Sequence, residues 1–178
     1  MTKKHLFLVA LVLLLMTSGF LAQSQVLAQN ATSEPLVGLK AVRVEVKIIE
    51  GSDQRVQEIG LAQLLAQTEE QLSSAGLKVL GQDEYLRLRR SSNYPLALLE
   101  ILIGVFTIEE AGDVVVYAGH VRLNQTVCLA RKPSLNLLAP TWEFRTFGPT
   151  NDLPSLRERF KDIVSKLVQD YKSAGPAR

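Results

Sequence analysis

Two long apolar segments on either side of a short acidic turn constrain the fold of this 178-residue chain more than any other feature. Leu96–Ile108 is apolar on both faces of a strand apart from Glu100, which is typical of a central strand covered on both sides. Glu109–Asp113 supplies turn residues, and Val114–Ala130 returns with alternating apolar and polar side chains. The pattern predicts a long antiparallel strand pair inside a sheet.

Three shorter segments add further strands. Ala41–Ile49 alternates valines with charged residues, and Leu77–Leu80 is a short second strand. Thr141–Phe147 is predicted as a strand with two aromatic side chains on one face. Lys132–Pro140 contains two prolines and reads as a loop before this strand.

Two amphipathic segments predict helices. The first begins at Leu61 and ends before Gly76, which suits a left-handed helix terminus. The second lies near the carboxyl end and carries a continuous apolar stripe: Leu156, Phe160, Ile163, Val164, Leu167 and Tyr171. A further turn or two of helix is expected over Asp83–Arg90. The order β-α-β-β-β-β-α predicts an α+β two-layer sandwich, a mostly antiparallel sheet of about five strands with two helices on one face.

The amino terminus predicts export. Lys3 and Lys4 precede the apolar run Leu6–Met16, and Val26–Ala28 offers small residues at a cleavage site, which is the order of a secretory signal peptide. A retained membrane anchor is the competing interpretation, but the apolar run is shorter than the roughly 20 residues needed to span a bilayer. The predicted division is a signal peptide (1–28), a flexible leader (29–37), one α+β domain (38–174) and a disordered tail (175–178). The mature protein would be periplasmic or extracellular, with no integral membrane span.

The charge balance argues against nucleic-acid binding. The chain has 20 basic and 18 acidic residues, and loss of Lys3 and Lys4 with the signal peptide leaves 18 of each. A neutral domain lacks the basic face that binds DNA or RNA. The only cysteine, Cys128, cannot form an internal disulfide, so stability must come from the core.

No arrangement of residues predicts catalysis. Cys128 and His120 lie eight residues apart on one strand, about 26 Å at roughly 3.3 Å per residue, which is too far for a nucleophile and its base. Cys128 is better interpreted as a partly buried structural thiol. Glu109, Glu110 and Asp113 match no calcium loop. We therefore predict no enzyme activity and no catalytic, cofactor-binding or metal-binding residues.

Five residues are candidate contacts with a ligand or partner. Gln125 lies on the apolar side of its strand, where a buried amide must find hydrogen-bond partners. The backbone or the Trp142 indole is the expected partner, and a ligand is the alternative. Leu135, Leu137 and Leu138 lie in the predicted loop. Two helices on one face leave the other face of the sheet open, so this loop or a second subunit is expected to cover it.

A longer pattern resembles a protein family. Val121–Arg131 reads V-x-L-x-Q-x-V-x-L-x-R and is followed by Thr141-Trp142 and the carboxy-terminal helix. This resembles uncharacterised exported bacterial proteins, and Leu72–Leu80 looks like the helix-to-strand turn of the same group. More loosely, the strand–helix–strand start is similar to amino-terminal domains of the TolB and curli-secretion kind. The resemblance implies export and no activity.

Two functions remain open. The first is a non-enzymatic exported domain that binds another envelope protein or a second copy of itself as a homodimer. The alternative is a small-molecule or lipid carrier, with a pocket lined by the two-faced apolar strand, the leucines and Gln125.

Overall fold

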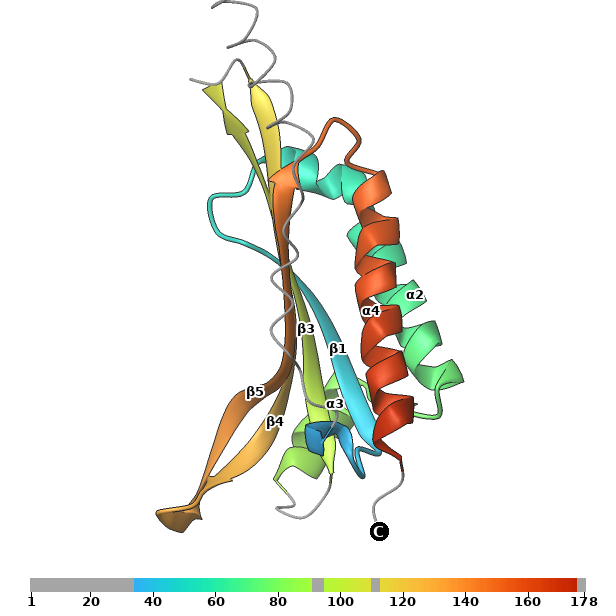
Figure 1. Cartoon of the computed structure of the whole chain (residues 1–178), viewed down its shortest axis with the longest axis vertical. Helices are drawn as coiled ribbons and strands as arrows, with labels where there is room; N and C mark the ends of the chain where they lie inside the picture. The colour runs from blue at the N-terminus through green and yellow to red at the C-terminus, as the bar shows by residue number, and fades with distance from the viewer. Residues whose placement is uncertain (1–33, 91–94, 110–112, 176–178) are drawn as a thin grey trace, which may run out of the picture.

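The structure is a computed structural model, and it describes residues 34–90, 95–109 and 113–175 (Figure 1). The predicted signal peptide, residues 29–33 of the predicted leader and most of the tail lie outside the described residues. The same is true of residues 110–112 in the predicted turn. Within the described ranges no helix is long and apolar enough to cross a membrane.

A five-stranded mixed sheet forms one layer of the molecule, with strand order β2-β1-β3-β4-β5. Strand β1 is parallel to β2 and β3, whereas β3–β4 and β4–β5 are antiparallel. The strands are β1 (Ala41–Ile48), β2 (Lys78–Val79), β3 (Leu96–Ile108), β4 (Val114–Leu129) and β5 (Lys132–Pro149).

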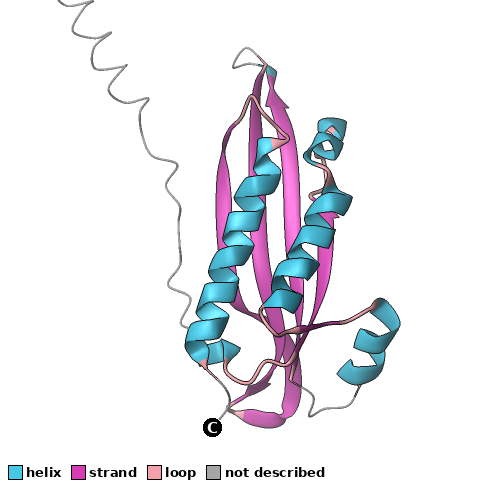
Figure 2. Cartoon of the chain, turned by 90° about the vertical axis from the view of Figure 1, so that its right-hand side faces the viewer, coloured by secondary structure: helices cyan, strands magenta, loops and turns pink. Residues whose placement is uncertain are grey.

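Two helices, α2 (Leu61–Ser74) and α4 (Ser155–Ala174), lie side by side over one face of the sheet (Figure 2). Gly76 ends the first helical segment with a φ of 89°. Short 3₁₀ helices, η1 (Glu34–Leu36) and η2 (Gln54–Ile59), precede β1 and α2. The predicted α+β two-layer arrangement with two helices on one face is confirmed.

The core lies between these helices and the sheet. Leu99 and Ile101 of β3 and Val121 of β4 are completely buried beneath α4, where Phe160 is 0% exposed. Gly119 of β4 permits this close approach, because a Cβ atom there would lie only 2.5 Å from Cζ of Phe160.

A third helix, α3 (Gln82–Arg89), packs on the opposite face of the sheet. Its Tyr85 is 3% exposed and contacts a small apolar cluster that includes Leu96 and Leu98 of β3. The segment predicted as one or two helical turns therefore covers one end of the face that two helices leave open. The expectation that the segment Lys132–Pro140 covers this face is wrong.

The prediction of a loop over Lys132–Pro140 is also wrong, because these residues are the first half of β5. They extend the antiparallel pairing with β4 almost to its end, where Leu129 lies opposite Lys132. Pro133 and Pro140 favoured a loop in the sequence. An edge strand tolerates proline because no neighbouring strand needs its missing N–H.

The described part of the chain starts inside the segment predicted as a leader. Leu36 in η1 is 0% exposed and belongs to the main core. The backbone N–H of Leu39 donates to the carbonyl of Leu36 at 3.2 Å. The folded domain thus includes residues just before Gly38.

Replacement of Phe160 with alanine tests the core. We expect Phe160→Ala to lower the free energy of unfolding by about 3–5 kcal/mol, because it empties a fully enclosed site against Gly119. Chemical denaturation measures the change, and Lys161→Ala on the neighbouring half-exposed position is the control. Wild-type stability in Phe160→Ala would show that α4 is not a wall of the core.

Candidate functional site

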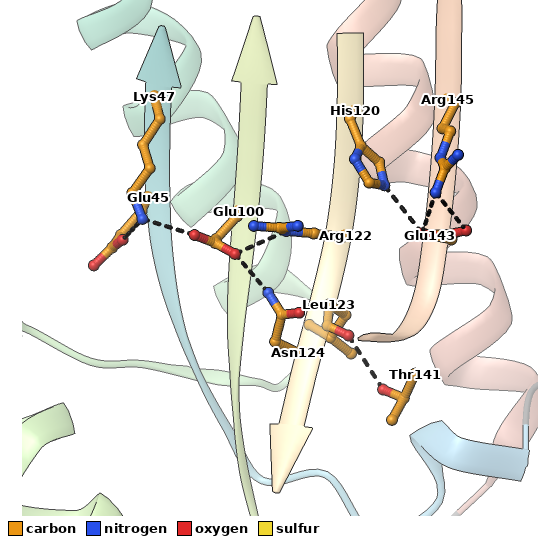
Figure 3. A network of polar contacts seen from close by, with 10 residues as sticks. All are labelled: Glu45, Lys47, Glu100, His120, Arg122, Leu123, Asn124, Thr141, Glu143 and Arg145. Atoms are coloured by element: carbon orange, nitrogen blue, oxygen red, sulfur yellow. Dashed lines mark hydrogen bonds and ion pairs between the residues drawn. The ribbon is translucent and has the colours of Figure 1, made fainter. Parts of the chain in front are cut away.

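A row of charged side chains crosses the sheet on the face opposite α2 and α4 (Figure 3). Its centre is Glu100 of β3, which is only 7% exposed. The Glu100 carboxylate accepts hydrogen bonds from Lys47 Nζ at 2.7 Å, Arg122 Nε at 2.9 Å and Asn124 Nδ2 at 2.7 Å. Three neighbouring strands are thereby joined through one carboxylate.

The ionised form of Glu100 is favoured in this setting. Burial by itself raises the pKa of Glu100, but hydrogen bonds from Lys47 and Arg122 outweigh it and hold the pKa below its ordinary value. The hydrogen bonds to Glu100 and Glu45 in turn raise the pKa of Lys47. Glu100 is held ionised and accepts hydrogen bonds from three side chains. It is therefore better explained as a structural link between strands than as a group that transfers protons.

A second polar group lies farther along the same face. His120 Nε2 is 3.1 Å from Glu143 Oε2, and Arg145 donates to the same carboxylate at 3.3 Å. The Cys128 side chain is exposed and donates to Asn136 Oδ1 at 3.0 Å. The structure thus does not bring Cys128 and His120 together, and the interpretation of Cys128 as partly buried is wrong.

Gln125 and Trp142 do not bond to each other. Trp142 is 2% exposed, and its indole Nε1 donates to Asp170 Oδ2 of α4 at 2.9 Å. Gln125 is half-buried and accepts a hydrogen bond from the Thr141 hydroxyl. Each side chain has a hydrogen-bond partner within the chain, so of the two partners expected for Gln125 the Trp142 indole is wrong. A ligand-binding role for either residue stays an untested prediction.

The three predicted leucines lie on a projecting hairpin arm, which comprises residues 126–138 at the ends of β4 and β5. Strand β3 reaches only as far as the pair Ala97–Gln125, so the arm is a two-stranded ribbon beyond the body of the sheet (Figure 1). Leu135, Leu137 and Leu138 are 39–42% exposed. Leu137 and Leu138 are consecutive, so they point to opposite faces of the ribbon.

The outer edge of β5 has no neighbouring strand in the described sheet. Pro140 and Pro149 bracket a proline-free stretch from Thr141 to Gly148. Phe147 in this stretch is 61% exposed, the highest value among the exposed large apolar residues. Sequence reasoning placed the aromatic side chains here but could not tell which strand would be at the edge.

A groove lies at the other end of β4 and β5 from the arm. Its lining is Asp113, Val114, Val115, Pro149, Thr150 and Asn151. The Thr150 N–H donates to the Val115 carbonyl at 2.9 Å and thereby fixes one wall. The groove is far from Gln125 and Trp142, where the carrier hypothesis places a pocket.

The fold and these surfaces describe a small α+β domain with an open sheet edge. No family model and no curated protein matches the sequence. Among solved structures, the fold resembles the PelC dodecamer from Paraburkholderia phytofirmans, with a TM-score of 0.39, 14% identity, and 79% of this chain and 89% of that chain covered. A point variant of that dodecamer gives a TM-score of 0.38, 13% identity and coverage of 84% and 93%. Likeness at this level carries no argument about function.

Replacement of Glu100 with glutamine tests the charged row. At pH 7 we expect Glu100→Gln to lower the free energy of unfolding by about 1–3 kcal/mol, because two cations lose their shared carboxylate. A lowered pKa in the folded state stabilises the protein above the ordinary value of 4.5, and this contribution disappears as the pH falls through the folded-state pKa.

The difference between wild type and Glu100→Gln should therefore shrink between pH 7 and pH 3, as measured by urea unfolding at each pH. Glu158→Gln, which removes an exposed carboxylate of α4, is the matched control and should change stability little. A constant difference at all pH values would contradict the assignment of the ionised form.

Proposed function

We propose that the mature chain is an exported, non-enzymatic domain that works as a homodimer, formed by antiparallel pairing of two β5 edges. The observation that carries the proposal is the free edge of β5. An unpaired strand edge offers a row of N–H and C=O groups to another strand. Export is supported by the amino-terminal sequence pattern, and the absence of enzyme activity by the lack of any recognised catalytic motif in the sequence.

The length of the free edge suits a dimer. Strand β5 has 18 residues, and its prolines at 140 and 149 limit hydrogen bonding to the eight residues between them. Natural edge strands are commonly protected by proline along their length. Here the prolines stand at the two ends of a stretch long enough for a specific strand pair.

The charges in this stretch are self-complementary. A two-fold axis through Phe144 sets Glu143 of one copy opposite Arg145 of the other, and the reverse pair forms across the axis. An axis through Glu143 or Arg145 would instead set like charges opposite each other, which destabilises a strand pair. Arg145 is 61% exposed and is available to a partner. Isologous two-fold contacts of this kind are the commonest in soluble oligomers.

The aromatic side chains agree with the same register. Phe144 of each copy would lie beside its counterpart on the helix face. The two Phe144 side chains would be cross-strand neighbours at about 4.5–5.5 Å between Cβ atoms. Phe147 would lie on the other face near the β-bulge of the second copy, so the most exposed aromatic residue would lose part of its contact with water.

Two charge-reversed variants test the register directly. Arg145→Glu leaves two acidic residues on each edge, and Glu143→Lys leaves two basic residues, so each variant alone should be monomeric. An equimolar mixture should form heterodimers, because every cross-axis pair is again of opposite charge. Size-exclusion chromatography with light scattering, for each variant and for the mixture, measures the outcome.

The control is Lys161→Glu, which makes an equal charge change on the half-exposed surface of α4 and should leave the dimer intact. Wild-type protein that stays monomeric up to near-millimolar concentration would refute the proposal. Dimers in both single variants would place the interface elsewhere.

A further inference from the structure

We infer that in this dimer the hairpin arm of each copy docks into the groove at the opposite end of the second copy. The inference rests on the proposed dimer and extends it to surfaces that the β5 edge does not include. It assigns an occupant to the groove and a role to the exposed leucines of the arm.

The register places the arm at the groove. Strand β5 has a β-bulge at Thr141, and the paired stretch ends at Pro140 and Pro149, so the two-fold axis at Phe144 fixes the direction in which the arm runs beyond them. In that direction, residues 137 and 138 of the arm run toward Thr150 and Asn151 of the second copy. Thr150 and Asn151 both line the groove. The same symmetry operation that pairs Glu143 with Arg145 therefore brings the leucines to the groove.

The curvature of the molecule permits this contact. The arm and the opposite β3–β4 end both bend toward the side away from α2 and α4 (Figure 1). A two-fold axis perpendicular to the sheet places the arm of one copy beside the β3–β4 end of the other. This rotation does not turn the sheet over, so both ends still bend toward the same side. The arm of one copy consequently follows the β3–β4 end of the other.

The surfaces have matching apolar character. Val114 is 38% exposed, and Val115 and Pro149 complete the apolar wall of the groove. Leu137 is 42% and Leu138 is 41% exposed on the arm. An isolated two-stranded ribbon is marginally stable in water, so contact of this wall with the arm would benefit both surfaces.

The charges of the two ends are opposite. The arm contains no acidic residue and carries Arg131 and Lys132 at its tip. The groove end carries the exposed acidic residues Glu109, Asp113 and Asp152. Attraction between the basic tip and this acidic end favours docking of a second copy and specifies which ends meet.

Disulfide trapping tests the contact. In a Cys128→Ser background, Leu137→Cys together with Asn151→Cys should give a covalent dimer on mild oxidation, because docking of the arm brings residue 137 to the groove wall at Asn151, within the Cα separation of about 4.4–6.8 Å that a disulfide needs. Leu86→Cys with Asn151→Cys is the control and should give no cross-linked product. Cross-linked species larger than a dimer would refute mutual docking of the two arms, because such species require head-to-tail contacts between successive copies.

A second variant measures the contribution of the arm without a cross-link. Leu137→Gln should raise the dimer Kd about tenfold or more and leave the melting temperature of the monomer unchanged. Leu86→Gln alters a leucine of α3 with nearly the same exposure, 41% against 42%, and should not change the Kd.

The outcomes separate this inference from the proposed function. A dimer that responds to the Glu143 and Arg145 variants but forms no 137–151 disulfide would overturn the docking of the arm and leave the dimer standing. A monomer in every assay would overturn both. Co-sedimentation of a monomeric protein with phosphatidylglycerol vesicles, lost in Leu137→Gln, would assign the arm to an anionic membrane surface instead.

Discussion

The structure depends on the burial of β3 on both faces. This strand pairs with β1 on one side and β4 on the other, and its alternate residues pack beneath α2 and α4. On the opposite face, α3 covers Leu96 and Leu98, and Glu100 follows directly along the same face. A carboxylate at such a position needs partners, and Lys47, Arg122 and Asn124 supply them from the neighbouring strands.

The unequal lengths and the order of the strands create the two exposed surfaces, the arm and the β5 edge. Strand β1 has eight residues, whereas β4 has 16 and β5 has 18. The last residues of β4 and the first residues of β5 have neither a third strand beside them nor α2 and α4 above them (Figure 1). The arm follows from this difference in length, whereas the free edge of β5 follows from the strand order.

The sequence correctly predicts a strand or helix where apolar residues recur at a regular spacing. The valines of β1 and the apolar stripe of α4 predicted their elements, and Phe160 and Leu167 are buried as that stripe requires. The prediction of a loop over Lys132–Pro140 is wrong because two prolines suggest a loop in any chain, whereas β5 is an edge strand of the described sheet, where proline is tolerated. The Trp142–Asp170 bond was missed because 28 residues separate its partners.

The sequence by itself determined the secondary structure of most elements and the two-layer α+β class. Apolar residues that recur every two residues mark the buried face of a strand, and those that recur about every 3.6 residues mark the buried face of a helix. Only the tertiary structure decided the strand order, the face that α3 covers and the partners of Glu100, Gln125 and Trp142. These features depend on register between distant segments, and no local pattern specifies which polar groups a folded sheet brings within hydrogen-bond distance. The exposure of Cys128 and of the arm leucines was decided in the same way, since burial is a property of neighbours and not of the residue alone.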